Sequence, residues 1–174
     1  IIYVRDILAE DTINVSRVSD FGTVVDSDIS GNGQVVVFAT NSRLTDADFD
    51  NAFDVYAFNL QSPVATKVSS FPDAPNPPLG TSFPTVNSTG TKIAFLSSAS
   101  NVVPGTSGVT PIDVFVTDLA SGIQRHVTGS AANALPDGSS FAPSISDNGS
   151  VAFYSSANNL TNGSTSLTRD VFFY

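Results

Sequence analysis

Short apolar stretches alternate along this chain with turns that are rich in Gly, Asn, Ser and Pro. The stretches are nearly continuous rather than alternating, which is typical of strands covered on both faces. Three of them follow a turn of the Asn-Gly or Thr-Gly kind, which predicts a hairpin because Gly and Asn tolerate a positive φ. The turn glycines are Gly33, Gly90 and Gly149, which are 57 and 59 residues apart. The pattern therefore predicts repeated β-hairpins, and no window carries a convincing helical period.

Two further landmarks repeat in step with these turns. An Asp-Val-aromatic triplet stands at 54–56, 113–115 and 170–172, and the opening 2–7 resembles 114–119. A basic residue or His followed by Val and then Ser or Thr recurs as Arg17-Val18-Ser19, Lys67-Val68-Ser69 and His126-Val127-Thr128. We expect the triplet to open a third strand of each repeat. The other landmark is expected on a short outer strand, around 16–19, 65–69 and 124–128.

Four strands in about 57 residues, covered on both faces, are typical of the blades of a β-propeller. The expected fold class is all-β, with about three four-stranded antiparallel blades. We expect one propeller repeat region over 1–174, made of a partial blade (1–20), two blades (21–70 and 71–129) and a second partial blade (130–174). Closed propellers have about four to eight blades. The chain is therefore expected to be a partial propeller or to close a ring by oligomerisation.

The third repeat resembles a known blade motif. It runs Pro143-Ser144-Ile145-Ser146-Asp147-Asn148-Gly149, then Val151-Ala152-Phe153, then Ser155-Ser156-Ala157-Asn158-Asn159-Leu160. This is similar to the TolB-type, WD-repeat-like β-propeller repeat of bacterial secreted and periplasmic proteins. The first copy departs most, with Ser27 where Pro84 and Pro143 stand and Arg43 where Asn101 and Asn159 stand. The resemblance implies a propeller blade and names no activity.

Composition narrows the classes of function. Sixteen acidic residues against seven basic ones give a net charge of -9, which argues against a nucleic-acid partner. Cysteine is absent, so zinc-thiolate sites, iron–sulfur clusters and disulfides are excluded, and no apolar run is long enough to span a membrane. Little Lys and much Ser, Thr and Asn favour an exported protein. The chain lacks Met even at position 1, and we expect a processed form or a piece of something longer.

One acidic cluster, at 46–54, contains groups that are suited to binding a metal ion. Asp46, Asp48, Asp50 and Asp54, with Asn51, supply oxygen ligands of the kind that Ca²⁺ prefers. The cluster predicts a calcium site, and the alternative is an exposed loop whose acids keep a sheet edge soluble. Because Asp54 has counterparts in the other repeats, we also expect it to make a structural hydrogen bond to a turn.

Candidate catalytic residues are few. His126 is the single histidine, and its position matches that of Lys67 and Arg17 in the other repeats. We therefore expect a polar, solvated residue on an outer strand rather than a general base. No Gly-x-Ser-x-Gly nucleophile motif is present. The absence of Trp lowers the case for sugar binding, although carbohydrate stays open as a partner.

These observations favour a non-catalytic propeller segment of an exported or cell-surface protein. It would act as a binding or scaffolding surface, or assemble with itself through its blade edges. The alternative is the propeller portion of a secreted hydrolase or polysaccharide lyase whose catalytic residues lie mostly outside this chain. The expected partners are a protein or a further copy of the chain, and the expected location is extracellular, at the cell surface or periplasmic.

Overall fold

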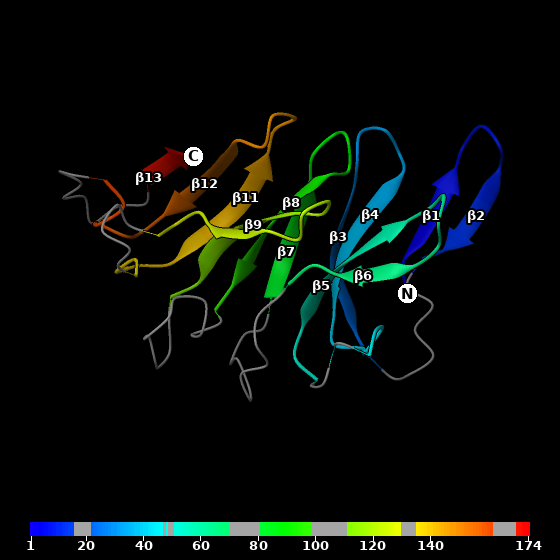
Figure 1. Cartoon of the computed structure of the whole chain (residues 1–174), viewed down its shortest axis with the longest axis horizontal. Helices are drawn as coiled ribbons and strands as arrows, with labels where there is room; N and C mark the ends of the chain where they lie inside the picture. Colours follow the sequence, from blue (N-terminus) through cyan, green and yellow to red (C-terminus); the bar gives the residue numbers. More distant parts are fainter. Residues whose placement is uncertain are drawn as a thin grey trace.

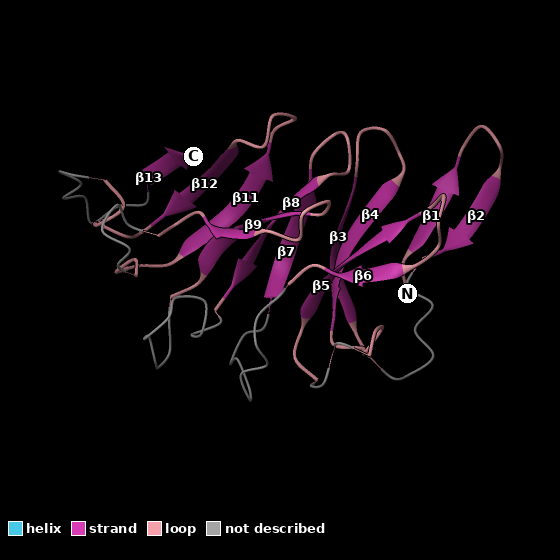
Figure 2. Cartoon of the chain, viewed as in Figure 1, coloured by secondary structure: helices cyan, strands magenta, loops and turns pink. Residues whose placement is uncertain are grey.

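The computed structural model describes residues 1–15, 22–46, 48, 51–69, 81–98, 111–129, 135–161 and 170–174. Within these ranges the regular structure is entirely β (Figure 2). The strands are β1 (Tyr3–Asp6), β2 (Asp11–Asn14), β3 (Val24–Ile29), β4 (Val35–Thr40), β5 (Asp54–Asn59), β6 (Ala65–Lys67), β7 (Thr81–Val86), β8 (Lys92–Ser97), β9 (Asp113–Asp118), β10 (Gln124–His126), β11 (Ser140–Ile145), β12 (Val151–Ser155) and β13 (Asp170–Phe173).

The strands form four antiparallel sheets in a row. We call β1–β2 the first hairpin, β3–β6 blade 1, β7–β10 blade 2 and β11–β13 blade 3. Each sheet is a meander, because consecutive strands are hydrogen-bonded neighbours. Figure 1 shows the sheets stacked side by side, with the first hairpin and blade 3 at opposite ends and no closure between them. The expected propeller-blade architecture is therefore confirmed, as an open row.

Apolar side chains fill the three seams between neighbouring sheets. The seam between blades 1 and 2 buries Val37, Val55 and Phe95, and the seam between blades 2 and 3 buries Val114 and Phe153. Blade 1 has a covered face on both sides, so all six residues of β4 are buried. This confirms what the continuous apolar runs predict. In β12 burial alternates instead, because no described sheet covers the outer face of blade 3.

The turns before the second strand of each blade behave as predicted. Gly33, Gly90 and Gly149 all have positive φ, and the aromatic residues Phe38, Phe95 and Phe153 are 5% exposed or less. Each blade also contains a feature without a sequence signal. The first strand of each blade bulges at a residue with φ between 45° and 51°, namely Asp26, Phe83 or Ala142.

The structure corrects the expected outer strand near the N-terminus. The strand lies at Asp11–Asn14 rather than around 16–19, where residues 16–20 fall outside the described ranges. Asn14 pairs with Tyr3 as Lys67 pairs with Tyr56. Val15 is buried and donates its N–H to the Ile2 carbonyl, as Val68 does to Val55. The counterpart of Lys67-Val68 is therefore Asn14-Val15, and the predicted Arg17-Val18-Ser19 lies outside the described residues.

Candidate functional site

In blade 1, a cluster of ionisable side chains joins the third strand, β5, to the fourth strand, β6. Asp54 begins β5, and its Oδ2 lies 2.9 Å from Nζ of Lys67 at the end of β6. The Ser69 hydroxyl donates to Asp54 Oδ1 at 2.6 Å and accepts the N–H of Val55. The Lys67 and Asp54 side chains are 12% and 10% exposed. We call these three residues the blade 1 pin, because they hold the outer strand to its neighbour.

Two more residues, Asp48 and Tyr56, lie beside this pin. Asp48 Oδ1 lies 3.8 Å from the Lys67 ammonium group, and the Tyr56 hydroxyl donates to Asp48 Oδ2 at 2.7 Å. Burial raises the pKa of the Asp54 carboxyl, and the hydrogen bonds from Ser69 and Lys67 oppose that rise. Burial also raises the pKa of the Tyr56 hydroxyl well above its usual range, and the hydrogen bond to Asp48 adds to the effect. Lys67 thus supplies the positive charge that these carboxylates require.

Blade 2 contains the same arrangement with a different base. Asp113 Oδ2 lies 3.2 Å from Nε2 of His126, and the Thr128 hydroxyl donates to Asp113 Oδ1 at 3.2 Å. The N–H of Val114 donates to Thr128, as that of Val55 donates to Ser69. The imidazole also stacks on Phe115, with 4.8 Å between ring centroids. We call Asp113, His126 and Thr128 the blade 2 pin.

This geometry changes the expectation for His126. Its side chain is 13% exposed, so it is not the solvated residue that the sequence predicts. The contacts fit the prediction of a structural rather than a catalytic environment. The imidazole ring pairs with Asp113, lies within hydrogen-bond distance of Thr128 and stacks on Phe115. The recurring Asp makes a structural hydrogen bond at Asp54 and Asp113, to the Ser or Thr two residues after the outer strand rather than to a turn as expected. Asp170 stands at the same strand position, but blade 3 has no fourth strand within the described residues.

The four predicted calcium ligands do not come together in the part of the chain that is described. Asp48 and Asp54 both approach the Lys67 ammonium group. Asp46 is exposed and lines, together with Asp48, an open depression of about 480 Å³. Asp50 lies outside the described residues. Across the described ranges, no group of three or more His, Cys, Asp or Glu side chains is placed to hold a metal ion. The described residues therefore give no support to the calcium prediction. Because Asp50 lies outside them, its part in a calcium site stays a prediction.

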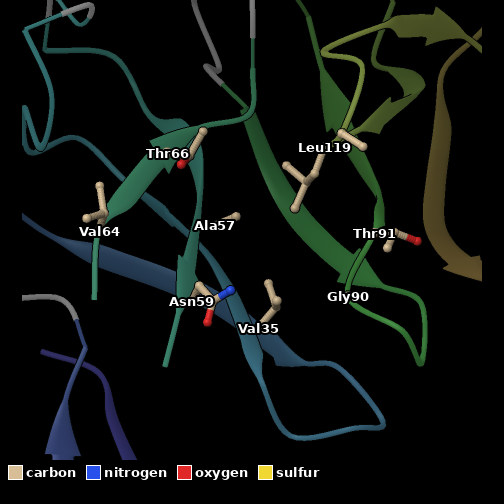
Figure 3. Close-up of a pocket in the computed structure, with 9 residues that line it drawn as sticks. Val35, Ala57, Asn59, Val64, Thr66, Gly90, Thr91 and Leu119 are labelled. Atoms are coloured by element: carbon tan, nitrogen blue, oxygen red, sulfur yellow. The ribbon is translucent and has the colours of Figure 1, made fainter. Parts of the chain in front are cut away.

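A groove of about 310 Å³ lies between blades 1 and 2 (Figure 3). Val35, Ala57 and Asn59 line it from blade 1, and Gly90 and Leu119 line it from blade 2. The cross-strand pair Val35–Asn59 in blade 1 corresponds to Lys92–Asp118 in blade 2. The Lys92 ammonium group and Asp118 form an ion pair at 2.8 Å. The blade 1 pair is therefore uncharged and lines a groove, whereas its blade 2 counterpart is an ion pair.

The hairpin tips of the three blades form a polar row, which we call the tip rim: 31–34, 88–91 and 147–150. The tips lie along the upper edge of the sheets in Figure 1. Hydrogen bonds join each tip to the next. Asn32 N–H donates to the Ser88 carbonyl at 2.9 Å, and Ser88 N–H donates to Asp147 Oδ1 at 3.1 Å. The rim is exposed over much of its length and is fixed by contacts between blades.

Sequence reasoning missed the pairing of Lys67 and His126 with the recurring Asp, and the cross-blade hydrogen bonds of Asp147. A signal for the pins does exist, because Asp54 and Lys67 have the same separation in sequence as Asp113 and His126. Asp26 and Asp28, which the sequence does not assign, hold the first strands of blades 1 and 2 together. Asp28 Oδ2 accepts from the Val86 N–H at 3.0 Å, and Asp26 Oδ2 accepts from the Phe83 N–H at 3.3 Å.

The fold matches solved propeller structures. Tricorn protease aligns with 87% of this chain at a TM-score of 0.59 and 14% identity, over 12% of its own length. TolB from Acinetobacter baumannii aligns with 99% of this chain at a TM-score of 0.56 and 12% identity, over 34% of its own length. An oligogalacturonate lyase in complex with manganese aligns with 98% at a TM-score of 0.53 and 10% identity, over 40% of its own length.

These similarities establish a β-propeller fold of the TolB-like kind. The chain spans less than half the length of each of these structures. No family profile matches the sequence, and no curated protein matches it either. The described residues include no helix that is long and apolar enough to cross a membrane.

Proposed function

We propose that this chain is a non-catalytic propeller segment of an exported protein, in the periplasm or at the cell surface, that binds or scaffolds a partner through its tip rim. One observation carries the proposal. The clustered ionisable residues of blades 1 and 2 occupy equivalent strand positions and make equivalent contacts. A reaction centre occurs once in a propeller, whereas a pin that repeats from blade to blade has a structural role in each blade.

The tip rim suits a binding surface for a physical reason. Its exposed groups include Asn32, Thr89 and Asn148, which can donate and accept hydrogen bonds. Bonds between the tips fix their relative positions before any partner arrives, which lowers the entropy cost of association. The exported location is supported by the low Lys and high Ser and Thr content and by the TolB-like fold.

The alternative is that the chain is part of an enzyme. It is favoured by the structural similarity to a lyase and a protease, whose activities are those of the whole neighbouring proteins. We therefore test both turnover and binding. The purified chain is incubated with oligogalacturonate and manganese, and separately with a peptide library, and products are measured.

We expect no turnover of either substrate class. Turnover by the wild-type chain that disappears in a folded His126→Gln variant would overturn the non-catalytic assignment. In the binding arm, oligosaccharides and peptides are screened on the immobilised chain and hits are measured by calorimetry. Binding that weakens in Thr89→Ala, but not in the exposed control Ile123→Ala, supports the tip rim as the surface. Binding that is indifferent to the rim would overturn that assignment.

A further inference from the structure

The groove between blades 1 and 2 lies where the next seam contains a lysine side chain. At Gly149, Cδ and Cε of Lys92 lie 2.7 and 3.1 Å from the place that a β-carbon would take. The Lys92 side chain therefore extends across the seam between blades 2 and 3, and its ammonium group pairs with Asp118. Val35 lies against Gly90 at the same strand position, but its side chain ends at Cγ. The space beyond Val35 belongs to the groove, because Val35 and Gly90 both line it.

Asn59 reverses the hydrogen-bonding character of this position. In blade 2, Asp118 Oδ1 accepts two N–H groups of the following turn, and Oδ2 accepts from Lys92. In blade 1, Asn59 Oδ1 accepts the corresponding N–H groups of Gln61 and Ser62, at 2.8 and 3.3 Å. The other arm of the amide is Nδ2, which Figure 3 shows directed into the groove. The groove therefore presents a hydrogen-bond donor where blade 2 has an acceptor.

The walls of the groove are aliphatic, and none of its lining residues is charged or aromatic. Val35 and Ala57 are fixed in the core of the seam and are 7% and 4% exposed, whereas Val64 is 65% exposed on the turn after β5. The volume of about 310 Å³ is at the lower end for a ligand site. All the lining residues are described, and they belong to two complete four-stranded blades. The groove is thus formed within the row of sheets and does not depend on either end of it.

We infer that this groove is the anchor subsite of the tip rim. It binds an aliphatic side chain of a partner protein, and the main-chain carbonyl beside that side chain accepts a hydrogen bond from Asn59 Nδ2. The inference deepens the proposed function and rests on it, because Gly90 and Thr91 belong to both the groove and the tip rim.

The chemistry of the groove selects this occupant. Aliphatic walls match an aliphatic side chain, and they offer no ring on which a sugar could stack. A neutral carbonyl fits the amide donor, whereas a free carboxylate would be repelled by the net charge of -9. Because two of the walls are already fixed in the core, binding orders little of this chain. One anchored segment should bind with a Kd on the order of 1 mM.

NMR titration of the isotope-labelled chain tests the inference. The probe is a blocked pentapeptide, acetyl-Gly-Ser-Leu-Ser-Gly-amide, and the control peptide has Gly in place of Leu. With the Leu peptide we expect saturable shifts of the Asn59 side-chain amide and of the backbone amides of Gly90, Thr91 and Leu119. The Gly peptide should leave these signals unmoved. Shifts that do not saturate below about 10 mM, or equal shifts with both peptides, would overturn the inference.

Two variants alter the groove in different ways. Val35→Lys/Asn59→Asp transfers the blade 2 ion pair into it and should lower the affinity for the Leu peptide by about tenfold or more, because a side chain then occupies the space. Asn59→Asp alone keeps the acceptor for the turn, as Asp118 does, but removes the donor, so the affinity should fall by about fivefold. Ile7→Asp/Leu8→Lys is the matched control with unchanged net charge, at positions that are 83% and 97% exposed.

Circular dichroism checks that the three variants are folded. An affinity for the Leu peptide that is unchanged in Val35→Lys/Asn59→Asp would overturn the inference. The result is separable from that for the tip rim. Partner binding that Thr89→Ala weakens, but that the two groove variants leave unchanged, would keep the rim as the surface and remove the anchor. Leu-peptide binding that requires Asn59, together with partner binding that ignores Thr89→Ala, would keep the groove and overturn the rim.

Discussion

Blades 1 and 2 hold the same pair of strands together with the same carboxylate and hydroxyl, but with different bases. The blade 1 pin uses an ammonium group, which stays charged, and two carboxylates surround it. The blade 2 pin uses an imidazole, which can also be neutral, and it adds a ring contact with Phe115. The comparison shows that the repeat keeps the geometry of the pin while the source of its binding energy changes.

The largest effect should follow from removing the carboxylate of the blade 1 pin. Asp54→Ala leaves the Lys67 ammonium group largely buried and without its 2.9 Å partner. We expect the free energy of unfolding to fall by about 3 kcal/mol, measured by urea denaturation at neutral pH. Asp46→Ala is the control, because Asp46 is exposed and should change stability by less than about 0.5 kcal/mol. Equal effects of the two variants would show that the pin does not stabilise the blade.

A smaller loss is expected from the equivalent change in blade 2. Asp113→Ala should lower the free energy of unfolding by about 1–2 kcal/mol, because the imidazole keeps its ring contact with Phe115. Thr128 also remains as a hydrogen-bond partner for the ring at 3.2 Å. The same denaturation experiment measures it. A loss as large as that of Asp54→Ala would contradict the distinction between the two pins.

Exchanging the base should convert one pin into the other. His126→Lys loses the ring contact with Phe115, worth about 1 kcal/mol, and gains a permanent pair with Asp113. We expect a net change in stability of less than about 1 kcal/mol. In this background, Asp113→Ala should become as costly as Asp54→Ala is in the wild type. A double-mutant cycle over positions 113 and 126 measures the change, and an unaltered coupling energy would refute the conversion.

The smallest effect concerns the Lys92–Asp118 ion pair of blade 2, whose counterpart in blade 1 is the uncharged pair Val35–Asn59. The hydrogen bond from Lys92 holds the pKa of the Asp118 carboxyl well below its usual range. A lowered pKa means that the stabilisation is present above about pH 4 and is lost as the pH falls through the folded-state value. Asp118→Asn should therefore be slightly less stable than wild type at neutral pH, and the difference should vanish in strong acid.

Thermal melts across the acid range test this prediction, and added salt should shrink the difference because the pair is partly exposed. Asn59→Asp is the matched reverse change in blade 1, where Val35 offers no ammonium group. It should give no stabilisation at any pH. A gap between Asp118→Asn and wild type that widens on acidification would contradict the assignment.

Much of the fold could be predicted from the sequence, because the same strand and turn positions recur in each copy of the repeat. The turn glycines, the core position of Phe38 and the recurring Asp54 all follow from comparing one copy with the next. The outer strand of the first hairpin could not be placed correctly, because Val15-Ser16 and Val18-Ser19 present the same pattern three residues apart. Only the pairing of Asn14 with Tyr3 distinguishes them.

The contacts that depend on register were harder to predict. The bulges occur at Asp26, Phe83 and Ala142, and of these residue types only Asp is enriched at positive φ. The pins join residues on neighbouring strands, so their bases are apparent only once β5 is paired with β6. The acidic cluster favoured calcium because composition shows carboxylates together and does not show that Lys67 lies among them.

Two of the tip glycines lie where neighbouring blades approach each other closely. A β-carbon at Gly90 would lie 2.7 Å from Val35 Cγ2, and one at Gly149 would lie 2.7 Å from Lys92 Cδ. Gly33, with the same kind of φ, has nothing within 4 Å of that position. The missing methyl groups let neighbouring blades approach closely at their tips. One added at 90 would press on Val35 and force blades 1 and 2 apart there, whereas the flexible Lys92 side chain can move away from one added at 149.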